Sequence, residues 1–159
     1  MLEVKPEHRA QESPRPPIKI AVDMGPLVGE HHVILDELGW FPVSWRQDDE
    51  AFGGYMALRY RFDPPLSKEE RYSRDFAWKV WVLTVTDDAG TIYDSATGGL
   101  GPTGGDREIH PAASPEATKL TLRVGTPYVT PDGRMQSSEA VAEVNVDLKT
   151  GEVKVLKAA

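Results

Sequence analysis

The chain has 159 residues, a formal net charge of −7 and 40% hydrophobic residues, among them four Trp, five Tyr and four Phe, which is enough for one domain with a buried core. Its acidic balance argues against a general nucleic-acid binder, and no apolar run is long enough for us to expect membrane insertion. The absence of cysteine excludes disulfides, zinc–thiolate sites and cysteine nucleophiles.

The first segment, residues 1–17, carries four prolines and charges of both signs, and we expect a disordered or extended leader there. It has no apolar region typical of a secretory signal. Residues 18–159 are predicted to form a single domain. The compartment stays open: extracytoplasmic, in the cell envelope, if a signal or anchor was removed, and cytoplasmic otherwise.

Three strands are expected in the first half of that domain. Residues 18–24 alternate between apolar and polar side chains, and residues 32–47 indicate a strand pair or one bent strand. In residues 55–62 the alternation predicts that the even-numbered side chains Met56, Leu58, Tyr60 and Phe62 face the core. Residues 66–75 form the one plausible helical turn, with Ser67 as its N-cap.

A long aromatic and β-branched run, residues 76–85, stops at Asp87-Asp88-Ala89-Gly90 and resumes at Ile92. This pattern predicts a hairpin whose first strand lies in the middle of a sheet and is covered on both faces. Trp78 and Trp81 would then point to opposite faces of that strand.

The rest of the chain is expected to hold a Gly- and Pro-rich loop over residues 95–117, interrupted at most by a short strand at residues 107–110. A strand follows at residues 118–124, and residues 139–147 and 152–156 form a terminal hairpin. Val153 and Val155 are predicted to face the same core as the alternate residues of the first hairpin strand.

Eight or nine short strands between turn signals predict an all-β fold, a two-sheet antiparallel sandwich with at most one short helical turn. The segment WVLTVTDDAGTIYD, the glycine-rich stretch after it and ATKLTLRV resemble the late strands of bacterial immunoglobulin-like sandwich modules of uncharacterised, telokin-like kinds. The resemblance spans residues 18–124, and the Cys…Trp…Cys signature of antibody domains is absent. It implies a non-enzymatic, extracytoplasmic role.

Three aromatic residues near a Gly- and Pro-marked bend are the candidate binding residues: Trp40, Trp45 and Tyr55. Core packing is the ordinary role for such side chains. If they are exposed on one side, they form a surface for a protein partner or a stacking platform for the sugar rings of a polysaccharide.

Clustered carboxylates give the candidate metal ligands, Asp48, Asp49, Asp87 and Asp88, which could hold a structural calcium. Turn formation is the simpler role for Asp87 and Asp88, because Asp and Gly suit tight hairpin turns. No other cofactor is expected.

No catalytic constellation is evident. His31 and His32 are adjacent, so on a strand they point to opposite faces and cannot readily share a metal, although one of them with His110 and an Asp could. The loop at residues 98–106 lacks the Lys and the helix start of a phosphate-binding loop. We therefore expect a non-catalytic interaction module with a protein partner, and a carbohydrate-binding module as the alternative.

Overall fold

The computed structural model describes residues 15–42, 45–46, 49, 53–72, 81–114, 116–125, 127–129, 131–133, 135–137 and 140–157. Within these ranges the fold is all-β, with one short helix, α3 (Lys68–Tyr72). No helix in the described ranges is long and apolar enough to cross a membrane.

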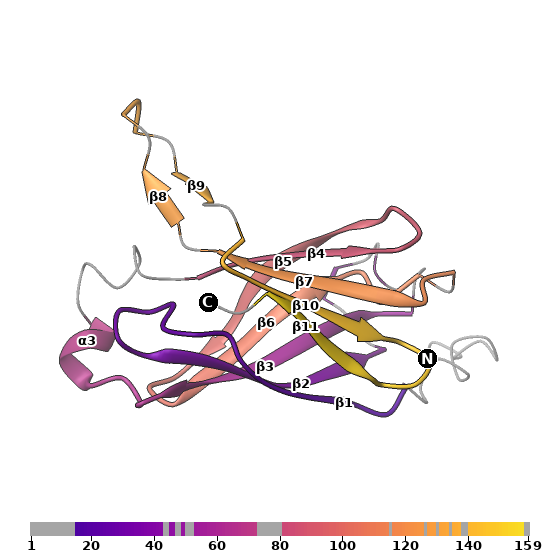
Figure 1. Ribbon diagram of the computed structural model, residues 1–159, viewed down its shortest axis with the longest axis horizontal. Coiled ribbons are helices and arrows are strands. Elements are labelled where there is room, and N and C mark those ends of the chain that lie inside the picture. Colours follow the sequence, from indigo (N-terminus) through magenta and orange to yellow (C-terminus); the bar gives the residue numbers. More distant parts are fainter. Residues whose placement is uncertain are drawn as a thin grey trace, which may run out of the picture.

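Nine strands form one antiparallel sheet in the order β1-β2-β3-β6-β5-β4-β7-β10-β11. Their bounds are β1 Ile18–Asp23, β2 His32–Phe41, β3 Tyr55–Asp63, β4 Val82–Asp87, β5 Ile92–Leu100, β6 Gly104–His110, β7 Lys119–Gly125, β10 Ala142–Asp147 and β11 Val153–Lys157. Two further strands, β8 (Pro127–Val129) and β9 (Met135–Ser137), pair with each other as a ribbon that projects from the body (Figure 1).

The sheet curls, so that β4, β7, β10 and β11 lie across β1, β2, β3 and β6 (Figure 1). β5 makes the corner, because it pairs with β4 only at residues 92–93 and with β6 from Asp94 to Leu100. Tyr60 and Trp81 meet edge to face across the interior, with ring centroids 4.9 Å apart. One apolar cluster lies between the two parts of the sheet and draws residues from both.

Alternation along the strands places this core as the sequence predicts. Met56, Leu58, Tyr60 and Phe62 of β3 are buried, and so are Leu120, Leu122 and Val124 of β7. Trp81 is buried, and Trp78 falls outside the described residues. β4 lies between β5 and β7, as expected of a central strand, but the prediction that both its faces are covered is wrong, because Thr84 is exposed.

The helical turn begins where the sequence indicates. The Ser67 hydroxyl accepts a hydrogen bond from the Glu70 amide at 3.1 Å, and the Glu70 carboxylate accepts one from the Ser67 amide at 3.1 Å. This reciprocal capping satisfies two amides that a short helix would otherwise leave without a partner.

The glycine-rich stretch differs from its prediction. Instead of a loop over residues 95–117, β5 and β6 pair through it and turn at residues 101–103. Its glycines serve close backbone packing: a Cβ on Gly104 would lie 2.1 Å from the Tyr60 carbonyl oxygen, and one on Gly105 would lie 2.1 Å from that of Gly99. Close backbone approach is an alternative use of glycine that composition alone does not distinguish from a loop.

The terminal hairpin also departs in one detail. Val155 pairs with buried Val144 and so lies on the core side of the sheet, as predicted, yet it is 47% exposed. β11 is the last strand in the sheet order, and no described strand covers its outer edge.

Candidate functional site

A row of side chains crosses four strands at one end of the outer sheet face. Phe41 of β2 pairs with Tyr55 of β3, and His110 of β6 pairs with Asp94 of β5. The Tyr55 ring stacks on Phe41 at a centroid distance of 5.3 Å and on His110 at 5.0 Å. Their strand neighbours Met56 and Ile109 are fully buried, so the row lies on the face turned away from the core.

Within this row His110 is buried, and it contacts two carboxylates. Its Nδ1 contacts Oδ2 of Asp49, which is also buried, and its Nε2 lies 2.9 Å from Oε1 of Glu108. In this arrangement both nitrogens are engaged, so neither is open to a substrate.

Trp45 lies over the same histidine. Its indole Nε1 donates to Oε1 of Glu108 at 2.9 Å, its ring meets His110 edge-on at 5.6 Å, and the Arg46 guanidinium stacks over it at 4.9 Å. Trp45 is nevertheless 69% exposed. A large apolar side chain is thus held in one orientation while most of its surface faces solvent.

Of the three predicted aromatic residues, the structure brings two together. Trp45 and Tyr55 both contact His110, whereas Trp40 pairs with buried Met56 and packs against the core on the other face of β2. Because Trp40 and Phe41 are consecutive on a strand, they point to opposite faces. Phe41 therefore occupies the place in the cluster that was predicted for Trp40.

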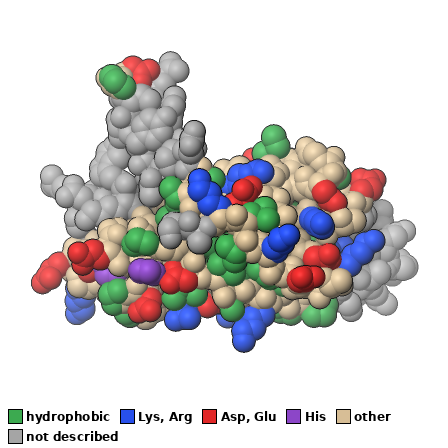
Figure 2. All heavy atoms as spheres, in the orientation of Figure 1, with side chains coloured by type: hydrophobic (Ala, Val, Ile, Leu, Met, Phe, Trp, Pro, Cys, Tyr) green, Lys and Arg blue, Asp and Glu red, His purple; other side chains and the backbone are tan. Residues whose placement is uncertain are grey.

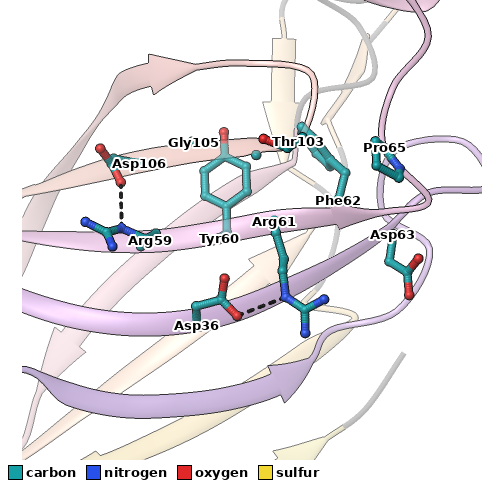
Figure 3. A pocket seen from close by; sticks show the side chains of 11 residues that line it. Asp36, Arg59, Tyr60, Arg61, Phe62, Asp63, Pro65, Thr103, Gly105 and Asp106 are labelled. Atoms are coloured by element: carbon teal, nitrogen blue, oxygen red, sulfur yellow. Dashed lines mark hydrogen bonds and ion pairs between the residues drawn. The ribbon is translucent and has the colours of Figure 1, made fainter.

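Farther along the same face lies an open groove of about 600 Å³ over β2, β3 and β6 (Figure 3). In this view Arg61 points to Asp36, with Nε 3.1 Å from Oδ1, and Arg59 points to Asp106 at 3.9 Å. Gly104 and Gly105 of β6 are among its lining residues. The outer face thus has an aromatic end and a charged end.

Burial and charge act together on Tyr55. Partial burial raises the pKa of its phenol, and the nearby carboxylates of Glu108 and Asp106 raise it further. The phenol therefore stays neutral around pH 7 and can donate a hydrogen bond.

The predicted calcium ligands lie in different settings. Asp48 falls outside the described residues, and Asp49 is engaged with His110. Asp87 accepts hydrogen bonds from the amides of Ala89 and Thr91, which confirms its turn role. Asp88 accepts bonds from Thr118 and the Lys119 amide, and the bonds from Thr118 are the main reason its pKa falls to about 2.

No three His, Asp or Glu side chains gather as a metal site within the described ranges. Calcium binding stays a prediction. The four oxygens of Asp87 and Asp88 already accept protein hydrogen bonds, which a cation would have to displace.

His31 and His32 lie at the far end of β3 from His110. His31 contacts Glu70 of α3 and the Pro64 carbonyl, and His32 contacts Asp23, so the adjacent pair faces different partners as predicted. His32 pairs with Asp63 at one end of β3, whereas His110 stacks on Tyr55 at the other end. The predicted combination of His31 or His32 with His110 is therefore not formed.

Sequence reasoning missed Glu108 and Phe41 as members of the cluster. The signal for Glu108 was available: in residues 107–110, Glu108 and His110 alternate with apolar Ile109 and must share the outer face of any strand formed there.

Comparison with known proteins identifies no family. No protein-family model matches the chain, and no curated protein matches it. Among solved structures, a conserved domain protein from Bacillus anthracis aligns with 75% of this chain at 19% sequence identity and a TM-score of 0.39. The chain spans 44% of the length of that protein.

Proposed function

We propose that the chain is a non-catalytic interaction module that binds a protein partner through the end of the sheet centred on Trp45. The observation that carries the proposal is the exposed but fixed indole. Tryptophan is enriched among the residues that dominate binding energy, and an anchor already held in place loses little conformational freedom on binding.

The surroundings of Trp45 suit a protein interface. Phe41 adds a second exposed aromatic ring, 43% exposed, and the ion pair of Arg46 with Asp94 lies beside it, with N and O 3.4 Å apart. An apolar centre with a polar rim is the usual anatomy of such surfaces.

We also propose that the fold is a two-sheet sandwich of the immunoglobulin-like kind, divided at the corner in β5. Its support is the single apolar cluster between the two parts of the curled sheet. The resemblance of residues 18–124 to bacterial modules of this kind favours a role in the cell envelope.

A carbohydrate-binding module is the second candidate. It is favoured by the placement of Trp45 beside Glu108, because sugars are bound by an aromatic face together with side chains that hydrogen-bond their hydroxyls. Only Trp45 and Tyr55 of the three predicted residues could take part, since Trp40 packs against the core.

Capture of binding partners with wild-type and variant protein tests both candidates. A protein partner should be retained by the wild type and by Ile92→Ala, which removes an equally exposed apolar side chain elsewhere, and lost with Trp45→Ala. We expect Trp45→Ala to weaken the purified complex by about thirtyfold or more, as for a binding hot spot.

Titration of intrinsic fluorescence with a panel of polysaccharides is the second arm. A saturable change that Trp45→Ala abolishes would favour the carbohydrate candidate. Equal retention of every partner by Trp45→Ala, together with flat titrations, would contradict both.

A further inference from the structure

The outer edge of β11 carries backbone groups without a strand partner. β11 ends the sheet order, and β10 is its only strand neighbour in the described part of the chain. Alternate N–H and C=O groups of such an edge point outward and can pair with an added strand.

Two apolar side chains of this edge are exposed. Val155 lies on the core side of the sheet but is 47% exposed, and Leu156, where the register with β10 shifts, is 46% exposed. A strand laid along β11 would cover Val155 and extend the core by one strand. The apolar surface therefore indicates an incomplete sheet.

The charges along the edge are positive although the protein as a whole is acidic. Lys154 and Lys157 are exposed and form no ion pair with any described carboxylate. Lys154 shares a shallow hollow with Asp147 and Glu152, and even there no carboxylate oxygen lies within 4.0 Å of its ammonium.

Beyond the β10–β11 turn, which itself carries Asp147 and Glu152, lies a second group of positive side chains. A cavity of about 520 Å³ is lined by the start of β1 and by this turn. Its charged lining residues are Arg15, Lys19 and Lys149, and no carboxylate is among them. The two edges of the sheet converge here, since a Cβ on Gly151 would lie 3.9 Å from Ile18. Figure 2 shows Lys and Arg side chains, with Asp and Glu side chains among them, on the part of the surface that β10 and β11 occupy.

The opposite edge of the sheet is built differently. β1 contains a register shift between Lys19 and Val22, and Ala21 adopts φ +52°, a conformation that interrupts the regular ladder. Such irregularity protects an edge against added strands. β11 also shifts register, after Val155, but its register is regular from Val153 to Val155, and this stretch is the part of the two edges suited to pairing.

We propose that β11 binds an extended acidic segment of a partner protein, which adds to the sheet as an antiparallel or parallel strand. Alternate apolar side chains of that segment cover Val155, and its carboxylates pair with Lys154 and Lys157. Lysines on an edge normally discourage self-pairing, and two copies of β11 would bring these positive edges together. An acidic strand turns the same lysines into favourable contacts, and this is why the inferred occupant is acidic and not a second copy.

The probe is a short blocked peptide in which glutamate alternates with valine, compared with the same peptide carrying lysine for glutamate. Binding to the full chain is measured by fluorescence anisotropy, and the contact is mapped by amide chemical shifts. We expect saturable binding of the acidic peptide alone, with shifts concentrated in residues 153–157 and an affinity that falls as salt is added.

The charge-reversed double variant Lys154→Glu and Lys157→Glu should bind the acidic peptide about tenfold more weakly or worse, the effect of losing two exposed ion pairs. Lys68→Glu in α3 is the matched control and should bind like the wild type. Trp45→Ala should also bind normally, which separates this edge from the surface proposed above. A thermal melt followed by circular dichroism checks that each variant is folded.

Several outcomes would overturn the proposal: no saturable binding at about 1 mM peptide, equal binding of the lysine peptide, or shifts that lie away from β11. Concentration-dependent self-association that Val155→Lys abolishes would identify a second copy as the occupant instead. The wild-type measurements decide the matter even if the double variant does not fold.

Discussion

Replacement of His110 by alanine tests whether the buried network under Trp45 is energetically significant. The imidazole is 2% exposed and contacts the buried carboxylate of Asp49 on one side and Glu108 on the other. Removing the imidazole takes a hydrogen-bond partner from the buried Asp49 carboxylate, which costs about 1–3 kcal/mol. The ring contacts with Tyr55 and Trp45 add about 0.5–1.5 kcal/mol each.

Together these losses predict that His110→Ala lowers the free energy of unfolding by about 4 kcal/mol, a large part of the 5–15 kcal/mol typical of a domain. Urea unfolding followed by far-ultraviolet circular dichroism measures it. In the double variant with Asp49→Asn the loss should fall short of the sum of the single losses by about 2 kcal/mol, because the two side chains contact each other.

Glu108→Gln is the matched control. The amide oxygen of glutamine can still accept from the Trp45 indole, and we expect a loss of about 1 kcal/mol or less. A loss below about 1 kcal/mol for His110→Ala, or strict additivity with Asp49→Asn, would refute the reasoning.

Three further predictions concern other parts of the fold. Burial alone would lower the pKa of His31, but its hydrogen bonds to the Pro64 carbonyl and Glu70 raise it, and the bond from His31 lowers the pKa of Glu70. The His31–Glu70 contact should thus stabilise the fold fully between about pH 4.5 and 6.5, and weaken above this range as His31 loses its proton and below it as Glu70 gains one. The difference in urea midpoint between wild type and His31→Gln should be largest in this pH range. A difference that does not change with pH would contradict the prediction. Gly104→Ala places a Cβ 2.1 Å from a carbonyl oxygen of β3 and should lower the free energy of unfolding in urea by about 3 kcal/mol. Gly99→Ala, whose Cβ would have nothing within 4 Å, should lower it by less than about 1 kcal/mol. Equal losses for the two variants would argue against close packing as the cause. β7 and β10 pair directly up to Ala142, without help from the β8–β9 ribbon. Replacing residues 126–140 by a short turn should therefore change the free energy of unfolding by about 1 kcal/mol or less. A loss of cooperative unfolding would instead show that the ribbon supports the sheet.

Much of the fold follows from local patterns. Alternation in β3 and β7 identified their buried faces, and the Asp87 turn and the Ser67 cap were placed correctly, because each depends on residues within a few positions of one another. The period of two along a strand decides which face is apolar before any partner strand is known.

The errors in the fold have a common cause. The glycine-rich stretch was taken for a loop, and the exposure of Val155, which was correctly placed on the core side, was not foreseen. Composition shows that a backbone can turn or pack closely, and alternation shows which way a side chain points. Neither composition nor alternation shows which strand lies beside a given strand. The neighbouring strand decides whether Gly104 belongs to a sheet and whether Val155 is covered.

The candidate site was only half predictable. Trp45 and Tyr55 were identified as candidates from the sequence, but Trp40 was included in place of Phe41, since the register of β2 against β3 decides which of the two faces outward. The contact of Glu108 with Trp45 spans 63 positions of the chain and has no local signal.

The sequence by itself determined an all-β chain, the polarity of its strand faces and the chemistry of its turns, because these arise from interactions between near neighbours. Only the tertiary structure decided that Asp49, Glu108 and Trp45 meet at His110, and that β11 is left at an open edge. Those features depend on strand order and register, which are set by the packing of the whole sheet around one core.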